Sequence, residues 1–280
     1  MIGSYGALVL RAWHRPSGRA GVLALAVLSL AALLLPPALP DPAAMPDVLA
    51  GALPPSSESW FGTDHLNRDI FSRVMHGGRI SLAIAGLAVL LSATLGALVG
   101  VVSAWVGGWV DVILMRLVDG ALAIPRLFIL LLLLVVWEQI PLGALILALG
   151  TTGWFATSRL VRAEVLRLRE EDFVRAARGL GAGGWRTIVR HLLPNAAGPL
   201  LVAATLAVGD VILLEAGLAF LGLGVQPPTP SWGGMVLEAR PLILSAPWTA
   251  LFPGGAILAT VLAVNLVGEA LQAALDPRSA

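Results

Sequence analysis

The chain has 280 residues, of which 58% are hydrophobic and only 12% are charged, and its formal net charge is +1. Soluble domains carry about 25% charged residues, so the charge present here is too little for a water-soluble surface. The small net charge excludes nucleic-acid binding through bulk electrostatics. The absence of cysteine excludes disulfide scaffolds and thiolate metal sites. These figures predict an all-α integral membrane protein.

Six stretches of the sequence are long and apolar enough to cross a bilayer, which requires about 20 residues. The first follows three arginines, as a signal peptide would, but its length and the spans behind it favour a retained anchor. The third is unusually long and contains Pro125, which should interrupt the helix. The predicted spans are 20–40, 80–104, 110–137, 141–157, 196–225 and 248–267.

The placement of arginine predicts the orientation. With the N-terminus inside and the spans alternating, 13 of the 18 arginines fall on the inner side and four on the outer side, while Arg126 lies within the third span. Basic residues are in excess in cytoplasmic loops. Both termini are therefore predicted to be cytoplasmic.

The first outer segment, 41–78, begins Pro-rich and is expected to end in a short separate helix. Asn67 is placed to cap this helix, and Asp69 lies in its first turn. Such a helix would lie in the plane of the membrane interface, with contact to a protein partner as the alternative. Its apolar stripe consists of Ile70, Phe71, Val74 and Met75.

Small residues recur every four positions on the second span, at Ser92, Gly96 and Gly100. Small residues at this spacing allow helices to approach closely in a membrane, where lipid offers no hydrophobic drive for association. The pattern predicts a helix-packing face.

Three charged residues, Arg126, Asp210 and Glu215, fall well inside predicted spans, away from their cytoplasmic ends. Charges there are costly and usually face a bundle interior or water. Arg126 and Asp210 lie at similar depths, about 22 Å and about 20 Å along their helices from the cytoplasmic side. We expect the two to pair, structurally or as part of a polar pathway lining. In the alternative, Arg126 reaches along the Pro125 kink and Asp210 meets a second subunit.

The longest predicted cytoplasmic segment, 159–195, is expected to form a helix, a turn and a second helix. The acidic residues 170–172 favour a helix start, and the glycines of 181–184 allow a sharp turn. Small and apolar residues share one face of the first helix, beside arginines. Such a face favours docking into a groove of another protein, and a basic loop resting on anionic lipid is the alternative.

The same segment resembles the cytoplasmic loop signature of ABC importer permeases, with Ala176-Ala177, Gly181 and Pro194 in the expected register. Arg175 replaces the usual Glu of that signature. The stretch 173–182 is similar to the dipeptide, oligopeptide and nickel branch in particular. Further stretches resemble the C-type subunit of that branch, namely 61–64, 68–69, 72–73, 220–233, 265–266 and 275–278. Asn67 departs from the pattern of this branch, which usually has Gly at that position.

The resemblance implies a type I importer permease that forms half of a translocation pathway in the bacterial inner membrane. It also implies a second, homologous permease subunit in a heterodimer, two ATP-binding subunits and an extracytoplasmic substrate-binding protein. The cargo stays open between peptides, nickel chelates and related solutes. The residues that would couple the chain to an ATP-binding subunit are Asp172, Phe173, Arg175, Ala176, Ala177, Leu180, Gly181, Ala182 and Pro194.

On this basis the chain divides into an N-terminal part (1–78), a permease core (79–272) and a cytoplasmic tail (273–280). With no lysine in the sequence there is no P-loop, so ATP and magnesium would bind only to partner subunits. The four histidines lie on different segments without zinc-helix spacing, and no nucleophile elbow occurs, so we expect no enzyme, no cofactor and no metal. A self-contained secondary transporter or channel is the rival interpretation, although it would need a repeat that the sequence lacks.

Overall fold

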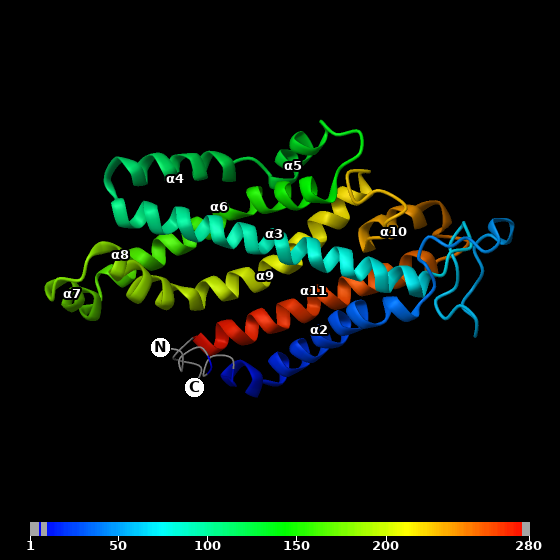
Figure 1. The fold of residues 1–280 in the computed structure, drawn as a ribbon, viewed down its shortest axis with the longest axis horizontal. Coiled ribbons are helices and arrows are strands. Elements are labelled where there is room, and N and C mark those ends of the chain that lie inside the picture. Colours follow the sequence, from blue (N-terminus) through cyan, green and yellow to red (C-terminus); the bar gives the residue numbers. More distant parts are fainter. Residues whose placement is uncertain (1–5, 7–9, 276–280) are drawn as a thin grey trace.

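The structure, a computed structural model, describes residue 6 and residues 10–275, and all regular elements in that part are helices. Five helical stretches are long and apolar enough to cross a membrane (Figure 1). The all-helical membrane architecture predicted from composition is therefore confirmed. The five stretches are α2 (Pro16–Leu34), α3 (Ile70–Val106), α6 (Leu142–Arg169), the continuous run Gly184–Phe220 and α11 (Trp248–Leu275).

A further span is broken. Helices α4 (Gly108–Leu122) and α5 (Arg126–Leu134) meet the same length and hydropathy test together, but they are bent by 86°. Pro125 is the residue before α5, and proline ends a helix because it lacks an N–H and clashes with the preceding turn. The described chain thus has five spans, or six when the bent pair is counted as one.

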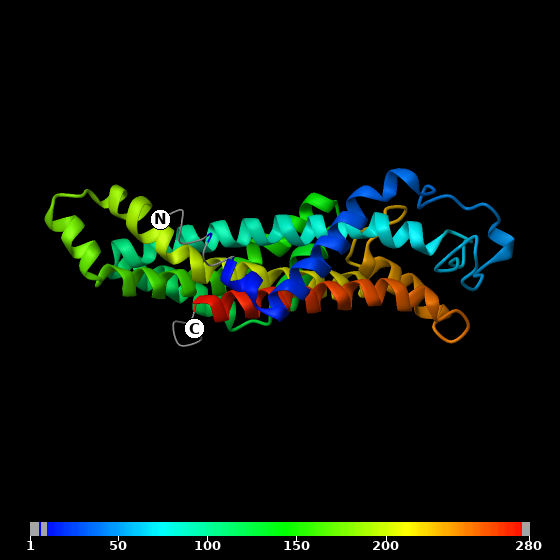
Figure 2. The same cartoon turned by 90° about the horizontal axis from the view of Figure 1, so that it is seen from below.

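The bundle is long and narrow, with different elements at its two ends (Figure 2). The start of α2 and the end of α11 lie at the same end as α7 (Asp172–Gly179) and α8 (Gly184–Thr187). The segment between α2 and α3 lies at the opposite end with α10 (Trp232–Ala239). Given the arginine distribution, we call the first end cytoplasmic and the second outer. Residues 276–280 of the predicted tail lie outside the described residues.

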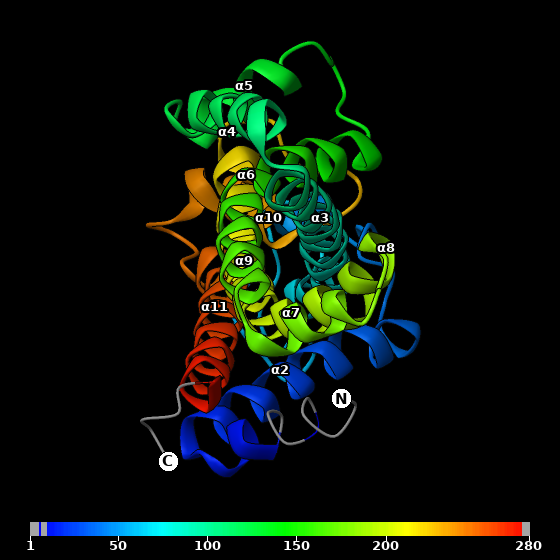
Figure 3. The same cartoon turned by 90° about the vertical axis from the view of Figure 1, so that its left-hand side faces the viewer.

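Helices α3 and α6 pack closely along the centre of the molecule. A Cβ atom at Gly96 would lie 2.6 Å from Thr157 Cβ, and one at Gly100 would lie 2.6 Å from the Ser158 carbonyl oxygen. Ser92 is buried on the same face of α3. Seen along the axis, α4 and α5 lie on one side of this pair and α2 on the other (Figure 3).

The structure corrects two predictions about the ends of the spans. The expected short interfacial helix is instead the first turns of α3, which runs unbroken from Ile70 into the membrane. Asp69, and not Asn67, caps it, since its carboxylate accepts a hydrogen bond from the Ser72 N–H at 2.7 Å. Asn67 has a positive φ of 56° and sits in the turn before the cap.

Helix α6 extends twelve residues beyond the predicted end at 157, to Arg169. Its last turns are rich in arginine, which ended the apolar stretch in the sequence. Val161, Val165 and Leu168 nevertheless continue a buried stripe at helical spacing. The remaining short helical turns are Pro36–Ala38, Val48–Ala50, Ile188–Leu192 and Arg240–Leu242.

Candidate functional site

The cytoplasmic end carries a helical hairpin, here called the elbow, which comprises α7, a turn at 180–183 and α8. Its turn has the hydrogen bonds of a Schellman motif, from Gly181 N to Arg178 O at 2.9 Å and from Ala182 N to Ala177 O at 3.0 Å. Gly181 has a φ of +85°, a conformation that favours glycine. The turn is therefore a defined structure and not a loose loop.

One side of the elbow is anchored in the protein. Val174 of α7, Thr187 of α8 and Leu192 are all 0% exposed. Val174 and Leu192 pack in a small core with residues from the cytoplasmic ends of α3, α6 and α9 (Leu193–Phe220). Movement of the elbow would therefore carry these helix ends with it.

The other side of the elbow is bare and apolar. Leu180 is 90% exposed, Trp185 78%, and Phe173 and Val189 43% each. Ala176 is exposed on the same helix, and Ala177 and Ala182 are half-buried. Large apolar side chains gathered at the tip of a cytoplasmic projection form a surface suited to docking a protein.

Polar contacts stiffen the elbow. Arg175 donates a hydrogen bond to Glu170 at 2.6 Å, which holds the pKa of that exposed carboxyl below its ordinary value. Asp172 lies in the first turn of α7, where a carboxylate is favourable. Pro194 follows a wide turn in which Leu193 N donates to Ile188 O, because proline cannot donate the regular helical bond.

Trp105, at the cytoplasmic end of α3, supports the elbow and was not predicted as a functional residue. The guanidinium groups of Arg169 and Arg178 lie 5.6 Å and 5.5 Å from the centre of its ring. A Cβ atom at Gly184 would lie 3.0 Å from the same ring. Trp105 therefore contacts both arms of the elbow. Only its place at the end of a span, opposite an arginine-rich segment, could have indicated this role.

Within the membrane region, Arg126 fastens α5 to α6. Its Nε donates to Thr152 Oγ1 at 3.1 Å, and its Nη2 donates to the Leu149 carbonyl oxygen at 2.5 Å. A Cβ atom at Gly153 would lie 3.0 Å from Nη2, so glycine makes room for the guanidinium.

Arg126 and Asp210 form no direct ion pair among the described residues, and their predicted pairing stays a prediction. Asp210 interacts electrostatically with Arg126, but no ion pair within 4.0 Å joins them in the described chain. Acceptors on α6 satisfy one edge of the guanidinium. Asp210 is exposed on α9, and no hydrogen bond to its side chain is found among residues 10–275.

Glu215, the third intramembrane charge, is 1% exposed and lies under the start of α10. One carboxyl oxygen accepts a hydrogen bond from Ser231 Oγ at 2.8 Å. Ser231 Oγ in turn accepts from the Gly234 N–H and so caps α10. Glu215 thus positions the outer turn before α10 and does not face the surface.

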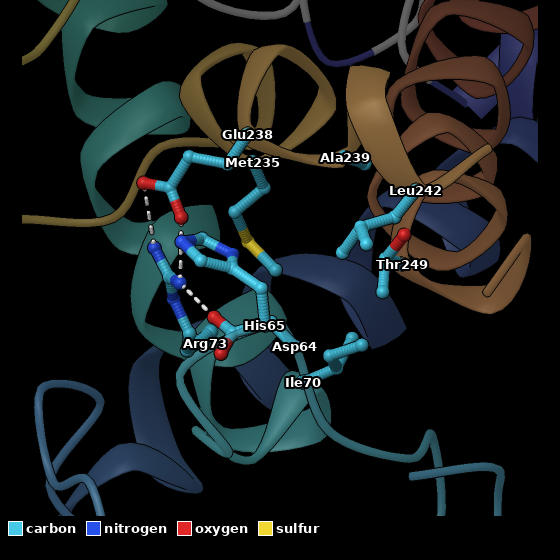
Figure 4. A pocket seen from close by; sticks show the side chains of 9 residues that line it. All are labelled: Asp64, His65, Ile70, Arg73, Met235, Glu238, Ala239, Leu242 and Thr249. Carbon is cyan, nitrogen blue, oxygen red and sulfur yellow. Dashed lines mark hydrogen bonds and ion pairs between the residues drawn. The ribbon is translucent and has the colours of Figure 1, made fainter. Parts of the chain in front are cut away.

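The outer end holds a largely buried network of four charges, Asp64, Arg68, Arg73 and Glu238, here called the outer ion network. Figure 4 shows three of them, Asp64, Arg73 and Glu238. Arg68 Nε lies 2.7 Å from Asp64 Oδ2, and Arg73 Nη1 lies 2.8 Å from Glu238 Oε2. Arg68 also pairs with Glu238, and Arg73 with Asp64. The two arginine side chains are 4% and 2% exposed. The network ties the segment before α3 to α10.

Burial alone would raise the pKa of Asp64. The hydrogen bond from the Arg68 N–H and the charges of Arg73 and Arg68 outweigh it, and they hold this pKa below the ordinary value of 3.8. Asp64, His65 and Glu238 also present metal-ligand atoms within 4.8 Å of one another. Because two guanidinium groups already neutralise the two carboxylates, the arrangement fits an ion network better than a cation site.

The sequence analysis did not predict this network, although its charges were visible as Asp64, Arg68 and Arg73 just before an apolar span. Glu238 stands 165 residues beyond Arg73. A lone acidic residue in an otherwise sparsely charged outer loop was the available signal for it.

Comparison with known proteins places these features in a family. The profile of the family described as binding-protein-dependent transport system inner membrane component matches residues 75–280. The chain belongs to this family and is a multi-pass permease of the bacterial plasma membrane. The family resemblance and the cellular location predicted from sequence are thereby confirmed.

Named relatives come from several bacteria. A candidate peptide permease protein of Brucella suis biovar 1 is 46% identical over 262 residues, covering 92% of this chain and 86% of the relative. The dipeptide transport system permease protein DppC of Bacillus subtilis is 39% identical, with 95% and 85% covered. The oligopeptide transport system permease protein OppC of that species is 43% identical, with 80% and 73% covered.

Proposed function

We propose that the chain is a peptide permease subunit of an ATP-driven importer and forms half of its translocation pathway. The names of its relatives supply the cargo, since they are described as peptide, dipeptide and oligopeptide permeases. Its partners would be a second homologous permease, two ATP-binding subunits that hold ATP and magnesium, and an extracytoplasmic substrate-binding protein.

The observation that carries this proposal is the elbow. It joins a bare apolar face, at Phe173, Leu180 and Trp185, to an anchored face at Val174 and Leu192. An ATP-binding subunit that docks on the bare face and closes would push on the ends of α3, α6 and α9 through the anchored face. A loop that merely rests on lipid would need neither the turn geometry nor the buried anchor.

A secondary transporter is the second candidate, because α5 begins at the intramembrane charge Arg126, directly after the 86° bend between α4 and α5. Broken helices at mid-membrane charges are typical of such transporters.

Reconstitution in liposomes separates the two functions. We expect peptide uptake only when the second permease, both ATP-binding subunits, the binding protein and ATP are all present. Peptide or ion flux through liposomes that contain this chain alone would refute the proposal and support the secondary transporter.

A further inference from the structure

Arg126 and Asp210 lie at the same depth in the bundle. Thr152, which binds Arg126, lies ten residues after the start of α6, and Asp210 lies ten residues before the end of α9. At the rise of an α-helix, each is about 15 Å from the outer end of its helix. The two helices run in opposite directions, so one cation and one anion share a layer of the membrane region.

The pair is open. Asp210 acts on Arg126 electrostatically but lies beyond the 4.0 Å of an ion pair. Thr152 and Leu149 bind Nε and Nη2 of Arg126, and within residues 10–275 no acceptor is found for its Nη1. Neither charge is therefore neutralised by an ion pair within residues 10–275.

A cavity of about 220 Å³ adjoins Arg126 between the bend and α6. Its other walls are mainly apolar, with Leu122, Ile129 and Phe155 among them, and Arg126 is its only charged lining residue. Sites for whole drug-sized ligands measure about 300–1,000 Å³, so this cavity suits one end of a peptide: a carboxylate with its terminal side chain.

The surface that leads to this layer from the cytoplasm is polar. Arg162 Nε lies 2.6 Å from Asp111, and nearer to the middle of the bundle Arg159 pairs with Asp119. The side chains of Arg159 and Asp119 are 51% and 42% exposed. Exposed charges are costly against hydrocarbon, so this face of α4 and α6 meets water or protein, as a translocation path requires.

We propose that Arg126 and Asp210 select the two charged termini of a short peptide, with Arg126 binding the carboxylate and Asp210 binding the ammonium group. This inference rests on the proposed peptide permease function. The two termini of a short peptide carry opposite charges, so two protein charges of opposite sign that do not pair directly with each other are complementary to them, whereas a direct ion pair would exclude them.

Uptake of one tripeptide in three forms tests the proposal: free, amidated at the C-terminus and acetylated at the N-terminus. The complete importer is reconstituted with the same binding protein throughout, so changes between variants report on the permease. We expect Arg126→Gln to lower the ratio of free to amidated uptake about tenfold or more, the effect of losing one hydrogen bond to a charged group. Asp210→Asn should lower the ratio of free to acetylated uptake instead.

Arg116→Gln on α4 removes the same charge away from the cavity and should leave both ratios unchanged. Arg126→Lys keeps the charge and should retain part of the carboxylate preference. This variant replaces Arg126→Gln in the test if the Arg126→Gln importer does not assemble. Unchanged ratios in the Arg126 and Asp210 variants would overturn the proposal, as would loss of the second permease from the Asp210→Asn complex. Absence of any ATP-dependent peptide uptake by the wild-type importer would instead refute the proposed function, and this inference with it.

Discussion

Replacing Leu180 with Ala should weaken docking of the ATP-binding subunit without disturbing the fold. The side chain is 90% exposed at the tip of the elbow, so the isolated permease gains almost nothing from it. A partner that covers it would remove it from water. Burial of a CH₂ group is worth about 0.8 kcal/mol, and Leu exceeds Ala by three carbon atoms.

The expected loss of binding free energy is therefore about 2 kcal/mol, or roughly a 30-fold rise in the dissociation constant, because 1.4 kcal/mol corresponds to tenfold. The assay is titration of the purified ATP-binding subunit onto the permease heterodimer in nanodiscs. The melting temperature of the permease should not change.

Leu244→Ala is the matched control, since Leu244 is 96% exposed in the outer turn before α11. It should leave the dissociation constant unchanged. If Leu180→Ala and Leu244→Ala bind the ATP-binding subunit equally well, Leu180 does not form part of the docking surface. A lower melting temperature for Leu180→Ala would show that the side chain supports the fold.

Three other predictions concern the turn of the elbow, the outer ion network and the packing of α3. Gly181→Val should abolish ATP-driven uptake while membrane insertion stays normal. The space around the glycine is open, but a φ of +85° is strained for a β-branched residue. Normal uptake by this variant would refute the coupling role of the elbow. The pKa of Asp64 is depressed, so its stabilising contribution is present above about pH 4 and is lost as the pH falls through the folded-state pKa. Thermal melts from pH 7 to pH 3 should therefore show a smaller acid loss for Asp64→Asn than for wild type, and equal losses would contradict this. Gly100→Leu should lower the melting temperature, since its Cβ would lie 2.6 Å from the Ser158 carbonyl oxygen, whereas Gly86→Leu on the same helix meets open space and should not.

Features governed by local composition could be predicted from the sequence. The apolar stretches gave the number of spans because a bilayer core demands about 20 apolar residues per crossing. The elbow was predicted because carboxylates, small residues and Gly181 each act on their own neighbourhood. Pro125 indicated an interruption in the third span, but the 86° angle depends on how α5 packs, which includes the hydrogen bonds from Arg126 to α6.

Features that depend on distant partners could not be predicted. The start of α3 was predicted to be a separate interfacial helix, although it is continuous with the second span. In the fold, Glu238 from α10 and Asp64 neutralise Arg73, so the helix passes it while it is 2% exposed. Opposite charges at similar depth predicted that Arg126 and Asp210 pair, but no sequence pattern reveals that a backbone carbonyl on α6 accepts a hydrogen bond from Arg126.

Helix α3 connects the two ends of the permease. It has 37 residues, or about 55 Å at the rise of an α-helix. At its outer end Arg73 is fixed by the outer ion network, and at its cytoplasmic end Trp105 touches both arms of the elbow. Between them Gly96 and Gly100 hold α3 against α6 at a distance that allows no side chain. If an ATP-binding subunit pushes on the elbow as proposed above, a helix clamped in this way would not absorb the push by bending locally, and the push would move α3 and α6 together as far as the outer end. The outer ion network and the elbow would then be the two ends of one rigid lever.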